Sequence, residues 1–115
     1  MTTPGPSLVV LCHGCRGSSP TSGTAFMEFG GATTCYEVLD QAGHRILVDC
    51  GTGLPGLGED GQTFDYSVFL THLHWDHTQG IPFWAPIYDP GSRLAFYAHR
   101  TEDLGTEEAL DQVMR

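Results

Sequence analysis

Basic side chains are scarce in this sequence. Its 115 residues include five Lys and Arg against 14 Asp and Glu, which gives a formal net charge of −9 at pH 7. A groove that binds nucleic acid needs a cluster of basic side chains, because contacts with phosphates supply much of its affinity. Nucleic acid is therefore not expected as a partner. A small anion is still compatible with this charge if divalent metal ions are bound, since the ions dominate the local field.

Long apolar segments are also missing. Hydrophobic residues make up 40% of the sequence, yet nowhere do they form the run of about 18 apolar residues that a membrane-spanning helix needs. The apolar segment 8–11 has no basic residues before it and no small-residue cleavage site after it, so it lacks the features of a signal peptide. These absences predict one small globular unit located in the cytoplasm, without a membrane partner.

Closely paired cysteines are few as well. Cys12 and Cys15 form one C-x₂-C pair, but a structural Cys₄ zinc site usually has a second one, and Cys35 and Cys50 lie far apart in two apolar segments. We interpret Cys35 and Cys50 as small buried residues in a reducing compartment. A thioredoxin-like role would require the pair to open a helix, whereas segment 16–20 has the composition of a loop.

Metal-ligand side chains, in contrast, are concentrated directly after the apolar segment 68–70. Three imidazoles and one carboxylate follow within six positions: His72, His74, Asp76 and His77. If 68–70 is a buried strand, its two-residue period places the first two histidines on one side of the strand end. Neutral imidazole and carboxylate suit Zn²⁺, Mn²⁺ or Fe. The spacing predicts a metal site rather than a polar loop with scattered histidines.

Short extended segments dominate the predicted secondary structure. Alternating and β-branched residues indicate strands at 8–13, 33–39, 45–49, 66–71 and 93–98. Residues 41–44 are predicted to form a hairpin turn, and the glycine-rich segment 51–61, with its Asp60-Gly61 turn signal, is predicted to be a loop.

Two helices are predicted in the second half of the chain. Asp76 and Gln79 have the spacing of an N-cap and an N3 residue, but Pro82 and Pro86 keep that helix short, so 81–88 is expected to form an irregular apolar cap. A second helix begins at Thr106, because acidic residues follow it and complement the helix dipole. We interpret the acidic residues near the end of the sequence as a solvated helix face: Glu102, Asp103, Glu107, Glu108 and Asp111.

The His-x-His-x-Asp-His pattern after a strand resembles the signature of the metallo-β-lactamase-fold hydrolases. Segment 14–20, Gly-Cys-Arg-Gly-Ser-Ser-Pro, resembles the opening loop of their phosphodiesterase-like and tRNase Z-like branch. Segment 30–38 resembles the start of the second strand, although Ala32 stands where that branch usually has Asn. Segment 47–53 resembles the strand and glycine turn that place a supporting aspartate beneath the metals.

The resemblance implies a fold and a domain boundary. These hydrolases form an αββα sandwich of two similar halves, and the sequence ends before the downstream ligands of the family. We therefore expect an α/β (α+β) fold in which residues 1–115 are the N-terminal half of the domain, with a mixed β-sheet flanked by short helices. The C-terminal half would be absent from this chain. A second chain or self-association is expected to cover the sheet face left exposed.

The resemblance also implies a mechanism. His72 and His74 would bind one ion and Asp76 and His77 a second, with Asp76 as the candidate catalytic carboxylate. The position of Asp49 between an apolar strand and Gly51 itself predicts a buried carboxylate beneath His72 that holds a ligand imidazole by its other nitrogen, in preference to a turn cap. Two divalent ions, zinc or alternatively manganese or iron, would share a hydroxide that attacks the substrate. The resemblance to the phosphodiesterase-like branch favours a small anionic phosphodiester.

Three functional alternatives follow. The first is a metal-dependent hydrolase whose complete site needs residues beyond this chain. The second is a non-catalytic metal-binding or assembly module that keeps the histidines. The third is a zinc interaction domain built on the cysteines. Among the other residues, His13 is expected to be structural or solvated, and packing in the core is favoured over substrate stacking for Trp75, Phe83 and Trp84.

Overall fold

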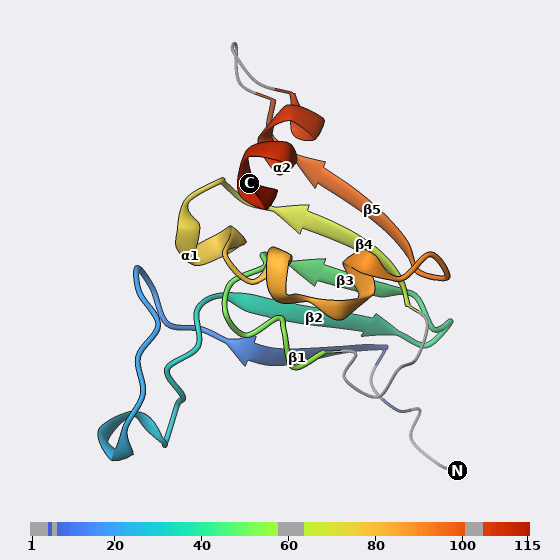
Figure 1. Ribbon diagram of the computed structural model, residues 1–115. Coiled ribbons are helices and arrows are strands. Elements are labelled where there is room, and N and C mark those ends of the chain that lie inside the picture. Colours follow the sequence, from blue (N-terminus) through green and yellow to red (C-terminus); the bar gives the residue numbers. More distant parts are fainter. Residues whose placement is uncertain (1–4, 6, 58–63, 101–104) are drawn as a thin grey trace.

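The computed structural model describes residues 5, 7–57, 64–100 and 105–115 of the chain. Within these residues, five strands form one sheet in chain order (Figure 1): β1 (Leu8–Gly14), β2 (Cys35–Asp40), β3 (Arg45–Val48), β4 (Asp65–Leu70) and β5 (Arg93–Ala98). β1 to β3 pair antiparallel, whereas β3, β4 and β5 pair parallel. The predicted mixed sheet is confirmed, and each predicted strand is found within two residues of its expected ends.

Short helices cover one face of this sheet. In front of the strands in Figure 1 lie α1 (Trp75–Thr78), the 3₁₀ turns η2 (Ile81–Phe83) and η3 (Ala85–Tyr88), and α2 (Thr106–Met114), while η1 (Thr24–Phe26) lies in a loop that projects away from the sheet. The predicted irregular cap at 81–88 is thus confirmed as two short turns. No helix in the described part of the chain has the length and hydropathy needed to cross a membrane.

The core lies between the sheet and these turns. Alternation along β4 directs Tyr66, Val68 and Leu70 toward the covered face, where all three are buried. Trp84 is fully buried against them, with its ring edge toward Tyr66 at 5.8 Å between centroids. Its indole N–H donates to the carbonyl of Leu57 at 2.8 Å, which satisfies the one polar atom of the side chain. The expected core packing is confirmed for Trp84.

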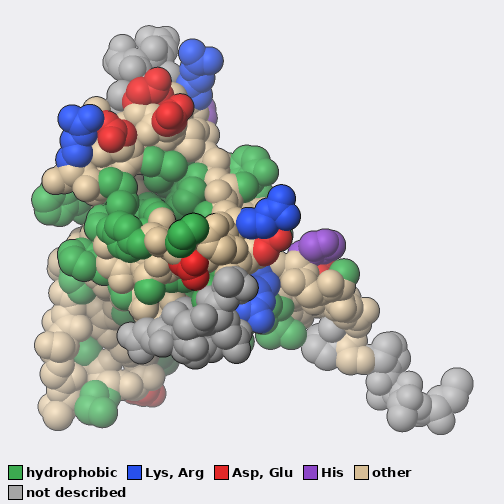
Figure 2. Space-filling model, turned by 45° about the vertical axis from the view of Figure 1, so that its right-hand side comes forward, with side chains coloured by type: hydrophobic (Ala, Val, Ile, Leu, Met, Phe, Trp, Pro, Cys, Tyr) green, Lys and Arg blue, Asp and Glu red, His purple; other side chains and the backbone are tan. Residues whose placement is uncertain are grey.

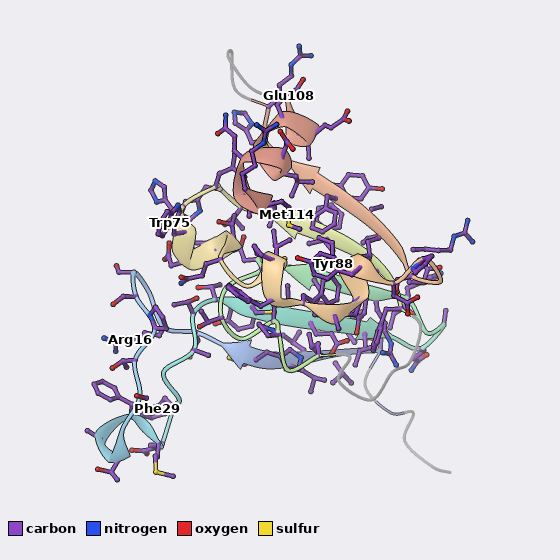
Figure 3. The ribbon with its side chains drawn as sticks, in the orientation of Figure 1. Arg16, Phe29, Trp75, Tyr88, Glu108 and Met114 are labelled. Atoms are coloured by element: carbon purple, nitrogen blue, oxygen red, sulfur yellow. The ribbon has the colours of Figure 1, made fainter. Side chains whose placement is uncertain are left out.

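Trp75 and Phe83 differ from that expectation. Trp75 is 83% exposed and Phe83 is 76% exposed, and Figure 3 shows Trp75 pointing away from the sheet. Core packing is therefore wrong for both residues. The physical reason is that α1 and η2 are single turns, so each can direct only one side toward the sheet.

The opposite face of the sheet carries apolar side chains that no described element covers. Leu8, Val10, Phe69 and Tyr97 lie on this face and are exposed. The parallel register of β4 and β5 places Phe69 beside Tyr97, and their rings stack at 4.8 Å between centroids. The side chains on one face of the sheet are thus buried in the core, whereas those on the other face form an exposed apolar surface.

The two predicted helix starts fare differently. α2 begins at Thr106 as predicted, and its exposed acids form part of the charged surface near the C-terminus (Figure 2). Glu102 and Asp103 lie outside the described residues, as does the predicted Asp60-Gly61 turn.

The start of α1 differs from the prediction. α1 has His74 as its N-cap residue, and Asp76 lies inside its first turn. The predicted N-cap role of Asp76 is wrong, because its carboxylate is engaged elsewhere.

Candidate metal centre

The floor of the candidate site is the turn after β3. Asp49 follows Val48 with φ 64°, a left-handed conformation that few residues other than glycine adopt and that Asp tolerates better than most. This conformation directs its carboxylate to the end of the neighbouring strand, where the Thr71 N–H donates to Oδ1 at 2.8 Å and the Thr71 hydroxyl donates to Oδ2 at 2.8 Å. The residue is 2% exposed, so Asp49 is a buried carboxylate held by directed hydrogen bonds.

The same turn anchors α1. The Cys50 N–H donates to the carbonyl of His77 at 2.8 Å, and the Gly80 N–H donates to the carbonyl of Cys50 at 2.9 Å. The backbones approach so closely that a Cβ atom on Gly51 would lie 2.4 Å from the carbonyl oxygen of Asp76. The glycine turn and α1 are therefore fixed against each other, which places the ligand-bearing helix above Asp49.

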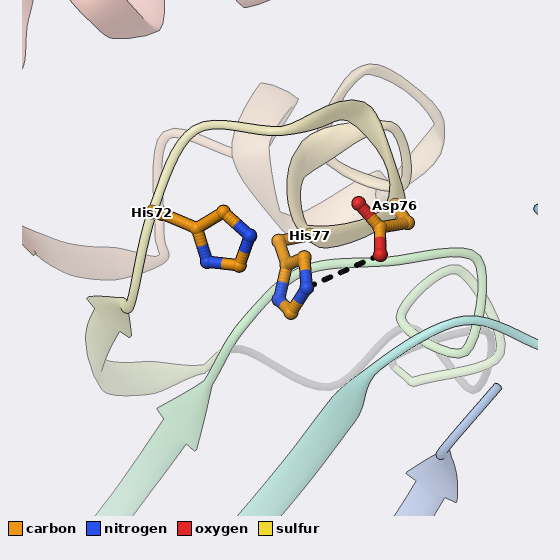
Figure 4. Close-up of side chains that lie close together, drawn as sticks. All are labelled: His72, Asp76 and His77. Carbon is orange, nitrogen blue, oxygen red and sulfur yellow. Dashed lines mark ion pairs between the residues drawn. The ribbon is translucent and has the colours of Figure 1, made fainter. Parts of the chain in front are cut away.

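Three of the four predicted ligands come together in this structure. One potential ligand atom from each of His72, Asp76 and His77 lies within 4.8 Å of the others (Figure 4). The ring centroids of His72 and His77 are 4.0 Å apart, and His77 Nε2 lies 3.2 Å from Asp76 Oδ2. His72 is exposed while the other two are half-buried, so the cluster opens to solvent on one side.

His74 lies beside this group but outside it. Its ring meets that of His72 edge-on, at 4.6 Å between centroids, and the side chain is exposed. The structure therefore groups His72 with Asp76 and His77 and does not divide the four residues into two pairs. The assignment of ligands to two separate ions stays a prediction.

Asp49 lies behind His77. Its Oδ2 is 2.8 Å from His77 Nδ1, which is an ion-pair distance, although the two groups do not have the geometry of a hydrogen bond. His72 is reached only indirectly, because its Nδ1 lies 3.0 Å from the Thr71 hydroxyl that binds Asp49. The sequence predicted Asp49 beneath His72, whereas the structure places it closest to His77. Its role toward a metal ligand remains a prediction.

A backbone contact from the opening loop holds Asp76. The N–H of Ser18 donates to Asp76 Oδ2 at 3.0 Å, and Ser18 has φ 69°. This hydrogen bond lowers the pKa of Asp76, with a smaller contribution from the nearby imidazoles of His77 and His72. Ser18 lies in segment 14–20, but no local pattern predicts this contact, because it joins residues 58 positions apart.

The donor set fits a divalent metal ion. Two imidazoles and one carboxylate are the ligands of many zinc sites that leave a position open. His77 Nδ1 faces Asp49 Oδ2 at 2.8 Å, whereas His77 Nε2 lies 3.2 Å from Asp76 Oδ2, so Nε2 is the ring nitrogen that faces the cluster. The buried carboxylate of Asp49 adds negative charge beneath the rings. The cluster therefore provides both the donor atoms and the electrostatic field that a cation needs.

The remaining predicted candidates lie away from this cluster. Within the described residues, no group of three or more potential metal ligands includes a cysteine, and Cys35 and Cys50 are fully buried, as predicted. His13 has a structural partner, since its Nε2 lies 3.1 Å from Glu37 Oε1. Glu37 is itself buried and accepts a hydrogen bond from the Tyr66 hydroxyl at 2.6 Å.

Two curated proteins are similar to part of this chain. The lactamase-like protein aptB of Emericella nidulans is 40% identical over 79 residues, which is 62% of this chain and 25% of that protein. Ribonuclease Z of Halorubrum lacusprofundi is 37% identical over 65 residues, which is 50% of this chain and 21% of that protein. No family model and no solved structure matches the chain. The two similarities support the resemblance to the metallo-β-lactamase-fold hydrolases at the level of the superfamily.

Proposed function

We propose that this chain carries part of the metal site of a metal-dependent hydrolase that acts on a phosphodiester. The convergence of His72, Asp76 and His77 carries this proposal, since their ligand atoms lie within 4.8 Å of one another. The similarity to a protein named ribonuclease Z supports a phosphodiester as the bond that is cleaved. The net charge of −9 favours a small anionic ester over a long nucleic acid.

The proposed roles follow from the contacts of each side chain. His72, Asp76 and His77 would hold a zinc ion, or alternatively manganese or iron, and His74 would extend the set if a second ion binds. When bound, the ions would lower the pKa of coordinated water and neutralise charge that develops on the phosphoryl group. The Ser18 N–H orients the Asp76 carboxylate, and the carboxylate of Asp49, 2.8 Å from His77 Nδ1, would hold that ring with Nε2 toward the ion.

Polypeptide outside residues 1–115 is part of the proposal. The chain spans a quarter or less of the length of the two relatives, so their whole activity cannot be assigned to it. Further ligands would come from additional sequence or from a second polypeptide. Because its own ligand set leaves each ion incompletely held, the isolated monomer is expected to have little or no hydrolase activity.

Metal content tests the proposed site directly. Elemental analysis of the zinc-loaded protein should find bound metal in the wild type and loss of most of it in a His72→Ala/His74→Ala double variant. His99→Ala is the matched control, since His99 is exposed and lies outside the cluster, and it should bind like the wild type. An unchanged metal stoichiometry in the double variant would contradict the assignment.

Activity on a chromogenic phosphodiester then separates a hydrolase from a non-catalytic metal-binding module. The assay should be run with and without a chelator, on the monomer and on the chain joined to its completing polypeptide. Chelator-sensitive turnover only in the completed protein is expected. Turnover by the monomer at an ordinary enzyme rate, about 1 to 10³ s⁻¹, would show that the completing residues are not required.

A further inference from the structure

An irregularity in β1 brings two cysteines to one face of the sheet. Cys12 pairs with Tyr36 and Gly14 pairs with Cys35, so two residues of β1 oppose one residue of β2. Such a bulge shifts the alternation of side chains by one position. Cys12 and Cys15 would face opposite sides of a regular strand, because they are three residues apart. With the bulge between them, both side chains lie on the same face of the sheet, close enough for Cys12 to raise the pKa of Cys15.

The bulge is held by close packing. A Cβ atom on Gly14 would lie 2.1 Å from the carbonyl oxygen of Thr33, so only glycine fits at this position. His13, beside it, is held through its ring by the buried carboxylate of Glu37 at 3.1 Å. The two thiols are therefore presented by a fixed piece of backbone and not by a free loop.

The four cysteines divide into two chemically different pairs. Cys12 and Cys15 are exposed, whereas Cys35 and Cys50 are fully buried. Burial raises the pKa of Cys35 to about 12 and raises that of Cys50 as well, so neither forms the reactive thiolate readily. Cys12 and Cys15 differ from them by their exposure, which lets a small disulfide reach the sulfur atoms.

A surface hollow lies next to this pair. Cys15, Arg16, Phe26 and Glu28 help to line a space of about 360 Å³, and the Arg16 guanidinium lies 5.0 Å from the centre of the Phe26 ring. Figure 3 shows Arg16 and Phe29, which also lines this hollow, on the projecting loop that follows β1. A small molecule can thus approach the sulfur of Cys15 from solvent.

We propose that Cys12 and Cys15 form a dithiol site that exchanges with low-molecular-weight disulfides and closes into an intramolecular disulfide. One protein thiolate attacks a sulfur of the small disulfide, which breaks its S–S bond and releases one small thiolate. The second protein thiolate attacks the protein sulfur of the mixed disulfide and releases the second small thiolate. The two protein thiols lose two protons and two electrons in total, and the electrons reduce the small disulfide to two thiols.

The site is separate from the proposed metal centre but borders on it. Cys15 lies three residues before Ser18, whose N–H binds Asp76. None of the histidine ligands takes part in the exchange. The dithiol can therefore be tested whether or not the chain is part of a hydrolase.

Oxidised glutathione is a suitable probe, applied to the folded, metal-free protein. Mass spectrometry should show the loss of two hydrogen atoms without an added glutathione, and alkylation after denaturation should label two of the four thiols. Peptide mapping should place the new bond between Cys12 and Cys15. In Cys12→Ser or Cys15→Ser the remaining partner should instead keep one bound glutathione. Cys35→Ala is the matched control and should still close the bond.

Three results would overturn the proposal. In the first, the wild type keeps four free thiols, and in the second it keeps bound glutathione and forms no internal disulfide. In the third, non-reducing electrophoresis of the wild type shows a disulfide between two chains. Circular dichroism should establish that each variant is folded. Peptide mapping of the wild type decides the question even if a serine variant fails to fold.

Discussion

Asp49 has a strained, left-handed backbone conformation, and this conformation places its carboxylate behind the proposed metal ligand His77. Its left-handed backbone costs about 1 to 3 kcal/mol in general, and the hydrogen bonds from Thr71 to its charged carboxylate offset this cost. The position of an aspartate between an apolar strand and Gly51 was sufficient to predict a buried carboxylate. Which imidazole it faces could not be predicted, because ring positions depend on how α1 packs against the glycine turn.

Replacing Asp49 by Asn should weaken metal binding more than it weakens the fold. Asn keeps the size of the side chain and tolerates the left-handed conformation, but it removes the charge 2.8 Å from His77 Nδ1. We expect a loss of about 10- to 100-fold in zinc affinity, as is usual when the partner of a ligand histidine is removed. Competition with a chromogenic chelator measures this affinity. Asp65→Asn, on an exposed residue of β4, is the control, and equal affinities for Asp49→Asn and wild type would contradict the role.

At the scale of elements, local patterns predicted the strands well and the helix cap poorly. Alternation of apolar residues located β4 and β5, because burial on one face enforces a period of two. The capping pattern at Asp76 and Gln79 failed, because the carboxylate of Asp76 accepts a hydrogen bond from distant Ser18 instead of capping its own helix. A pattern of neighbouring residues contains no information about a hydrogen-bond donor 58 residues away.

The hairpin between β2 and β3 should become less stable in acid. Asp40 accepts from the His44 N–H at 2.8 Å and lies 2.7 Å from His44 Nδ1. The side chain and backbone of His44 lower the pKa of Asp40 in the folded protein. Stability from a carboxylate with a lowered folded pKa is present above its unfolded pKa, about 4, and is lost as the pH falls through the folded pKa.

Urea unfolding of wild type and Asp40→Asn across the acidic range tests this pH dependence. The wild type should be modestly more stable above about pH 4, and the difference should shrink as the pH falls further. In a His44→Gln background, Asp40→Asn should lower the free energy of unfolding by less than it does in the wild type, because the contact with the imidazole ring is already absent. A difference that stays constant at every pH would show that the charge of Asp40 does not contribute.

At the scale of the whole molecule, one face of the sheet is covered and the other is not. The resemblance to an αββα sandwich predicted this asymmetry, because only one layer of helices accompanies a single sheet. The antiparallel pairing of β2 with β3 could be predicted from the short turn between them, because parallel strands need a long crossover. Connection length does not predict the pairing of β1 with β2, which is also antiparallel although a long loop joins these strands. Within the described residues no element covers the open face, and a partner for it stays a prediction.

The open face should bind a partner. Phe69, Tyr97 and Val10 form part of an exposed apolar surface, and apolar surfaces of this kind mark interaction sites or lead to association. We expect the isolated chain to bind an apolar-surface dye and to self-associate, or to bind a second polypeptide, with burial of at least about 1,000 Å² in total. Light scattering over a range of concentrations measures the association.

Two aromatic substitutions separate this face from exposed apolar residues in general. Phe69→Ser removes a ring from the open face, whereas Trp75→Ser removes a more exposed ring from α1, and both leave the covered core untouched. Dye binding and association should fall in Phe69→Ser and change little in Trp75→Ser, because only the first ring is part of a continuous surface with Tyr97. A monodisperse monomer at high concentration that binds no dye would mean that the strands close into a smaller fold and that the second layer is not needed.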